Sequence, residues 1–145
     1  MTTGRTVGQT EFIETIMPIS PWVDSAEITS PDGQHTARIQ EASEVGMGAP
    51  TSGELRLDGG PVYDSCNPSM VWSDDSKYFA VPQWTNERKQ RLLVVRISPR
   101  EHRYAPNIFR VLELHSFEDG VIRGVDSPVY LPGDVVVDIR ELNWT

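Results

Sequence analysis

Proline and glycine constrain this chain most, because both are frequent and evenly spread. The 145 residues include 11 prolines and 11 glycines. Proline breaks a helix interior, and glycine there costs about 1 kcal/mol relative to alanine. Apolar residues with helical spacing occur only between Glu11 and Met17, just before Pro18 and Pro21. We therefore expect at most one short N-terminal helix, within a tail over residues 1–20.

The remaining chain has the alternation and turn signals of an antiparallel all-β domain over residues 21–145. Leu55 and Leu57 alternate with charged residues, which predicts a half-buried strand. Residues 91–97 form the most apolar segment, which predicts a central strand buried on both faces. Further strands are predicted around residues 26–28, 35–41, 70–72, 78–84 with a break at Pro82, 109–115, 121–125 and 135–139.

The composition is that of an acidic folded domain. Hydrophobic residues make up 38% of the chain, and 13 basic against 21 acidic residues give a net charge of −8. General nucleic-acid binding is not expected, because phosphate contacts need clustered lysine and arginine. An acidic surface suits a basic protein partner instead. The sequence predicts no signal peptide and no membrane segment, so we expect a cytoplasmic protein, either a monomer or a small homo-oligomer.

Two segments repeat one another at an offset of 43 residues. Ser30-Pro31-Asp32-Gly33-Gln34 aligns with Ser73-Asp74-Asp75-Ser76-Lys77, and a strand flanks each segment on both sides. Aspartate accepts hydrogen bonds from nearby backbone donors in tight turns. A period of roughly 40–45 residues with several strands per unit is typical of propeller blades.

These residues resemble the first hairpin of TolB-like and WD-repeat propeller blades. The resemblance extends over residues 26–98 and is carried by the segments 30–34 and 72–81. Closed propellers need about four blades or more, and this chain has room for two or three. The resemblance therefore implies blade-like sheets, arranged as a partial propeller or as a twisted sandwich.

The chain also resembles immunity proteins of bacterial polymorphic toxin systems. Segments 44–53 and 81–84 carry this resemblance. It implies a cytosolic, acidic single domain that inhibits a cognate protein toxin by binding it. Many such toxins act on nucleic acid and would be basic, which agrees with the negative charge of this chain.

No catalytic constellation stands out in the sequence. His35, His102 and His115 lack metal-ligand spacing, and Cys66 has Asp64 nearby rather than an activating base. We therefore predict no catalytic residues, no metal and no cofactor. Two alternatives stay open: a small hydrolase that uses a histidine and a carboxylate, and a propeller-like structural module completed by oligomerisation.

The residues predicted to contact a partner share a position in loops or at strand ends. Acidic side chains there would attract a basic protein, an exposed methionine adapts to different surfaces, and a tryptophan can anchor an interface. The predicted contacts are Glu41, Glu44, Met47, Trp84, Glu87, Glu118 and Asp119.

Overall fold

The computed structural model describes residues 17–144. The expected helix between Glu11 and Met17 lies outside the described residues, apart from Met17. Residues 17–20 have no regular structure, but the side chain of Ile19 packs against the core.

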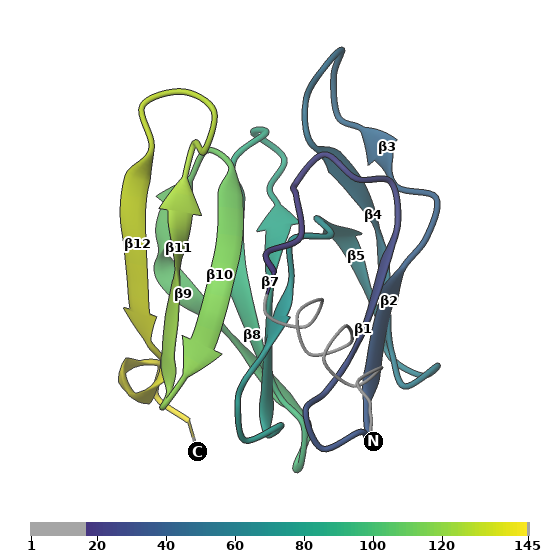
Figure 1. Ribbon diagram of the computed structural model, residues 1–145, viewed down its shortest axis with the longest axis vertical. Coiled ribbons are helices and arrows are strands. Elements are labelled where there is room, and N and C mark those ends of the chain that lie inside the picture. The colour runs from purple at the N-terminus through teal and green to yellow at the C-terminus, as the bar shows by residue number, and fades with distance from the viewer. Residues whose placement is uncertain (1–16, 145) are drawn as a thin grey trace, which may run out of the picture.

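Twelve strands and one short 3₁₀ helix make up the described chain, which is all-β with antiparallel pairing, as the sequence predicted (Figure 1). The elements are β1 (Ala26–Thr29), β2 (Thr36–Ile39), β3 (Ser43–Glu44), β4 (Thr51–Leu57), β5 (Val62–Cys66), β6 (Val71–Trp72), β7 (Tyr78–Trp84), β8 (Gln90–Arg96), β9 (Glu101–Phe109), β10 (Leu112–Glu118), β11 (Val121–Asp126), β12 (Gly133–Asp138) and η1 (Ile139–Glu141).

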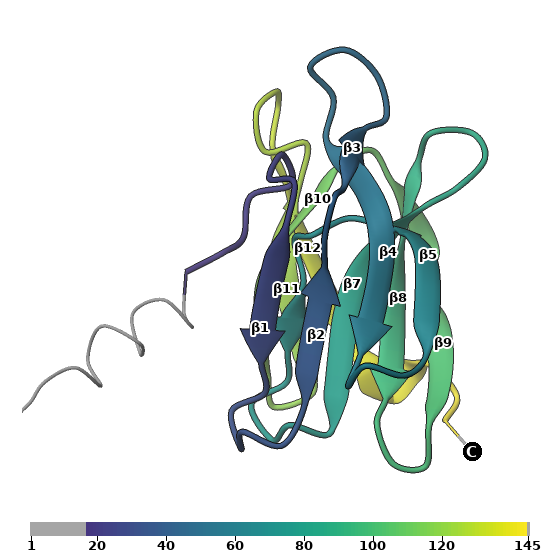
Figure 2. The ribbon, with the colours of Figure 1, turned by 90° about the vertical axis from the view of Figure 1, so that its right-hand side faces the viewer.

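The strands form one large curled sheet and one small sheet. The large sheet has the order β1-β2-β4-β5-β7-β8-β9, with β3 beside β4 and β6 beside β7. The small sheet has the order β10-β11-β12. Strands β7, β8 and β9 lie in the middle, with β1, β2, β4 and β5 over one face and the small sheet over the other (Figures 1 and 2). The large sheet encloses the first core by its own curl, and the small sheet packs against it around the second core.

Strand β8 is central, as its apolar sequence predicted. It pairs with β7 on one side and β9 on the other. Its side chains alternate between two cores: Leu93 and Val95 belong to the first, and Leu92 and Val94 to the second. All four are fully buried. Burial on both faces explains why this strand has no polar alternation.

Strand β7 runs without interruption through Pro82, contrary to the predicted break. The Pro82 carbonyl accepts a hydrogen bond from the Asn67 backbone N–H at 2.9 Å. In a strand, the carbonyl and the amide nitrogen of one residue point to the same side, so the missing N–H faces Asn67 and not β8. No donor to the β7–β8 ladder is lost, and Pro82 pairs in register with Leu92.

Other strands also differ from the prediction, which missed the two-residue β3 and most of β9, residues 101–108. Residues 109–115 do not form one strand, because the chain turns at Arg110 and Val111 and separates β9 from β10. The Asp126 carboxylate fixes this turn by accepting hydrogen bonds from both backbone N–H groups at 3.0 Å. Strand β5 was not predicted at all, because its alternation of exposed and half-buried residues includes polar groups on both faces.

The repeated segments form matching turns, which confirms the repeat at the level of local structure. In the first turn, the Ser30 hydroxyl donates to the Asp32 carboxylate at 2.7 Å, and the backbone closes from Ser30 N–H to the carbonyl five residues later at 2.9 Å. Ser73 and Asp75 make the same two kinds of bond at 2.7 and 2.9 Å. The turns also touch, because the Asp32 N–H donates to the Ser76 hydroxyl at 2.9 Å.

Candidate functional site

The fold divides the predicted contact residues between its two ends. The turn end is formed by residues 30–35, 73–77 and 119–120, and the hairpin end by residues 20–25, 45–50 and 85–89 (Figure 1). Glu41, Glu44, Met47, Trp84 and Glu87 lie at or beside the hairpin end. Glu118 and Asp119 lie at the turn end, where the Asp119 N–H faces the Asp74 carboxylate at 3.3 Å. A single face cannot contain all seven residues.

The loop between β3 and β4 presents Met47 at the hairpin end. The backbone closes a turn from Ala49 N–H to the Gly46 carbonyl at 2.9 Å. The Glu44 carboxylate accepts from the Gly48 N–H at 3.2 Å, so this side chain also braces the loop. Met47 is fully exposed. Hydrogen bonds therefore fix the backbone of this loop, while the apolar side chain of Met47 extends into solvent.

Thr51, the first residue of β4, connects the elements of the hairpin end. Its N–H donates to the Pro21 carbonyl at 3.1 Å, and its hydroxyl donates to the Val23 carbonyl at 2.6 Å. Its carbonyl accepts from the Trp84 indole N–H at 2.9 Å. One buried threonine thus fixes both the segment that carries Trp22 and the strand end that carries Trp84.

The side-chain amide of Asn67 also connects the segment before β1 to the start of β4. Asn67 is fully buried, and its amide nitrogen donates to the carbonyls of Pro21 and Thr51, each at 2.9 Å. Its oxygen accepts from the Ser69 N–H at 3.0 Å. A buried polar group with all of its partners in place is rigid, because any movement would leave hydrogen bonds unmade.

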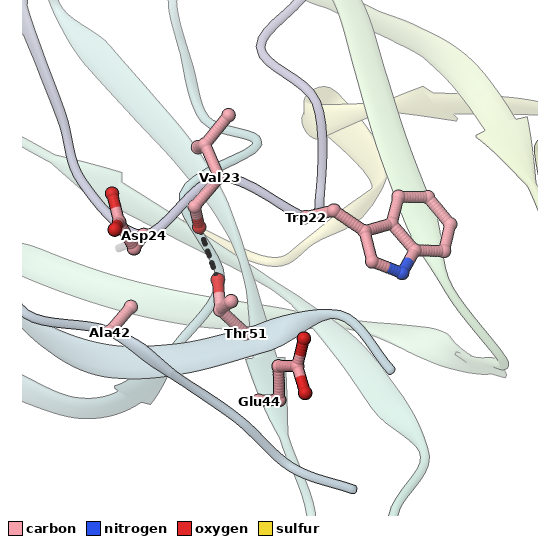
Figure 3. Close-up of a pocket in the computed structure, with 6 residues that line it drawn as sticks. All are labelled: Trp22, Val23, Asp24, Ala42, Glu44 and Thr51. Atoms are coloured by element: carbon pink, nitrogen blue, oxygen red, sulfur yellow. Dashed lines mark hydrogen bonds between the residues drawn. The ribbon is translucent and has the colours of Figure 1, made fainter. Parts of the chain in front are cut away.

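A groove of about 510 Å³ opens at the hairpin end. Figure 3 shows Asp24 on one side of the Thr51–Val23 hydrogen bond, and Glu44 with the Trp22 ring on the other. The Trp22 indole N–H donates to the Gly48 carbonyl at 3.0 Å, which ties the groove to the Met47 loop. The residues that line the groove are Trp22, Val23, Asp24, Ala42, Glu44 and Thr51. None of these described lining residues is basic.

The turn between β7 and β8 stands next to the Met47 loop. A side chain on Gly46 would contact the Arg88 guanidinium, since its Cβ would lie 3.4 Å from Nη1. Glu87 is exposed in this turn, and Trp84 is half-buried just before it. Trp84 thus combines the two roles considered from the sequence: its indole N–H is fixed inside, and part of its ring faces solvent.

Two of the three histidines lie beside carboxylates, and the cysteine is buried. His35 lies 2.9 Å from the Asp58 carboxylate, and His115 lies 2.9 Å from Glu113. Among the described residues, neither pair lines the groove or the second hollow, which lies at the turn end. Burial raises the pKa of the Cys66 thiol, and the charge of Asp64 raises it further, so the thiolate is strongly disfavoured.

Three residues important to the groove were missing from the predicted set. Trp22 and Asp24 come from the irregular segment before β1, and Thr51 from the start of β4. The adjacent Pro21 marked residues 20–25 as non-helical, but no local pattern placed them beside residues 45–50. The separation of Trp22 and Gly48 by 26 residues makes this contact a product of the tertiary fold.

Comparisons with known proteins found no relative of this chain. No protein family matches it, and neither the curated proteins nor the solved structures include a match. Over residues 17–144, no helix has the length and apolarity that a membrane crossing requires. Within the same range, no group of three histidine, cysteine or acidic side chains is placed to hold a metal ion. The class that the structure defines is an antiparallel all-β protein with an acidic, aromatic groove at one end.

Proposed function

We propose that this protein is a binding inhibitor of the immunity type, which neutralises a cognate protein toxin by occluding it. The groove at the hairpin end carries this proposal. It combines a half-buried Trp22 ring with the carboxylates of Asp24 and Glu44, and it lies beside the fully exposed Met47. Such a surface fits a basic and partly apolar protein segment.

The physical support is the combination of charge and rigidity. Acidic groups attract a basic partner before contact and speed its association. Aromatic anchors held in place lose little entropy on binding, so more of the contact energy contributes to affinity. The hydrogen bonds of Trp22 and Trp84 to backbone carbonyls supply this rigidity. A cytoplasmic location and a cognate toxin as the partner are parts of the same proposal.

Occlusion needs no turnover by the protein itself. The groove offers contact groups for it, namely the Trp22 ring and the carboxylates of Asp24 and Glu44. The inhibitor would act by covering the toxin's active surface, with its own surface unchanged. The hydrolase and the oligomeric structural module remain untested predictions.

The test is co-expression with the product of the adjacent gene, followed by binding kinetics on the purified pair. Glu41→Lys and Glu87→Lys should each lower the association rate severalfold at physiological salt, and more at low salt, because charges at the rim act before contact. Both residues are exposed at the hairpin end. Trp84→Ala should mainly raise the dissociation rate, because an anchor acts after contact.

The matched control is Glu118→Lys, the same charge reversal at the turn end. It should leave association unchanged within about twofold at physiological salt, where the Debye length is about 8 Å. Equal effects of Glu41→Lys and Glu118→Lys would show that only net charge matters. Failure of the pair to associate at micromolar concentration would refute the inhibitor proposal.

A further inference from the structure

The greatest concentration of exposed apolar side chains lies away from the groove, at the hairpin of β11 and β12. The described chain has eight large hydrophobic residues that are exposed, and four of them fall within residues 129–136. Val129, Tyr130 and Leu131 are 77%, 66% and 77% exposed in the loop, and Val136 is 56% exposed on β12. Pro128 and Pro132 flank the loop. Clustered apolar exposure of this kind marks an interaction surface.

Strand β12 is also a free sheet edge. It pairs with β11 alone through six consecutive residue pairs, without a register shift. Figure 1 shows β12 as the outermost strand of the small sheet. On such an edge, every second residue directs its N–H and C=O away from the sheet, where they are available to another strand.

The outer edges of β1, β9 and β10 are protected in ways that β12 is not. Strand β1 is only four residues long, and β9 contains Pro106 and a register shift in its pairing with β8. The outer side of β10 is occupied, because the Leu114 N–H donates to the Ser69 hydroxyl and the Phe117 carbonyl accepts from the Asp74 N–H. Short length, proline, irregular pairing and coverage all prevent strand addition. Strand β12 has none of these over its six residues.

Charge decides which kind of strand fits this edge. Asp134, Val136 and Asp138 lie on the same face of β12, since side chains alternate. A second copy paired antiparallel about Val136 would place Asp134 of one copy opposite Asp138 of the other. Each copy also carries a net charge of −8. Like charges directly opposite each other are destabilising. Asp138 is already paired with Arg140 at 2.8 Å, whereas Asp134 is exposed to solvent.

We infer that β12 binds an extended segment of a partner protein by strand addition, and that this segment alternates apolar and basic residues. The backbone of the segment continues the small sheet. Its basic side chains lie on the face of Asp134 and Val136, and its apolar side chains lie on the opposite face, beside Val135 and Val137. The loop residues 129–131 cover the end of the added strand. This surface shares no residue with the groove, so the inference is independent of the proposed inhibitor function.

The probe is a synthetic capped hexapeptide of alternating valine and lysine, added to the full-length protein. Amide hydrogen exchange followed by NMR should show the outward-facing amides of residues 133–138 exchanging at least about tenfold more slowly in its presence. Val136→Lys should abolish this protection, because it places a positive charge on the face that the lysine side chains of the peptide occupy. Val62→Lys is the matched control, since Val62 is also exposed on a strand but belongs to β5 of the large sheet, not to the small sheet.

Two further peptides separate strand addition from simple attraction between charges. A valine–glutamate peptide should not protect β12, and neither should a valine–lysine peptide with N-methyl groups on its pairing amides. Equal protection by the N-methylated peptide would overturn the inference, as would an unchanged exchange rate at millimolar valine–lysine peptide. A native mass showing a dimer of this chain that Val136→Lys dissolves would also overturn it, because the occupant would then be a second copy. Glu41→Lys should leave the peptide effect intact, whatever the outcome for the inhibitor proposal.

Discussion

The two ends of this molecule use the same residue types for different purposes. At the turn end, the carboxylates of Asp32 and Asp75 accept hydrogen bonds from their own turns. At the hairpin end, Glu41 and Glu87 are exposed, and the apolar Met47 extends fully into solvent. The acidic groups of these two turns thus stabilise the fold, whereas Glu41 and Glu87 remain accessible to a partner.

The tryptophans show the same contrast. Trp72 is buried at the turn end, where its ring stacks on His35 and packs on Phe79, and its N–H donates to the Ile28 carbonyl at 3.1 Å. Trp22 makes a similar N–H to carbonyl bond, but it lines an open groove. A single hydrogen bond therefore does not distinguish a structural tryptophan from one available for binding. The surrounding packing does.

Trp72→Ala gives the largest expected effect and tests this contrast directly. Removing a buried tryptophan should lower the free energy of unfolding by about 3–5 kcal/mol, because the cavity cannot be refilled. Trp22→Ala should cost less than about 1.5 kcal/mol, near the value of its hydrogen bond. Urea unfolding of both variants measures the difference. Similar losses would show that the hairpin end is as much a part of the core as the turn end.

Ser30→Ala and Ser73→Ala test how much each of the two repeated turns contributes to the stability of the turn end. Each hydroxyl bonds to an aspartate and accepts from a backbone N–H five residues later, at 3.1 and 2.9 Å. Each substitution leaves buried or partly buried groups without partners, which should cost about 1–3 kcal/mol. The exposed Ser43 at the hairpin side is the control, and its alanine variant should lose less than about 0.5 kcal/mol. A clear inequality between Ser30 and Ser73 would show that the two turns are not energetically equivalent.

The smallest effect concerns the pH dependence of stability at the turn end. The hydroxyl of Ser30 and the N–H of Gln34 lower the pKa of Asp32 from its ordinary value of 3.8. A carboxyl with a lowered folded-state pKa stabilises the fold above its unfolded-state pKa, and this contribution is lost as the pH falls through the folded-state value. Asp32→Asn should therefore be closest to the wild type in stability at the lowest pH. Urea unfolding at a series of pH values from 6 to 2 measures this, and parallel profiles for the two proteins would contradict it.

Sequence patterns were reliable where the structure depends on neighbours in the chain. The apolar residues 91–97 predicted a strand buried on both faces, and β8 has that position. Ser30, Asp32 and their counterparts 43 residues later determine their turns through bonds within five residues. Such local interactions form whatever the rest of the chain does, so they can be predicted from it.

Contacts between distant segments decided the remaining features. Pro82 stays within β7 because its nitrogen faces the Asn67 segment and not β8, and β5 is held by pairing more than by its own pattern. The sequence alone determined an acidic, antiparallel all-β protein with a repeated aspartate turn. Only the tertiary structure assigned Glu41 and Glu118 to opposite ends, joined Trp22 to the Met47 loop, and left the edge of β12 open. These features depend on which strands become neighbours, and that choice is made by burial of the two shared cores rather than by any local sequence signal.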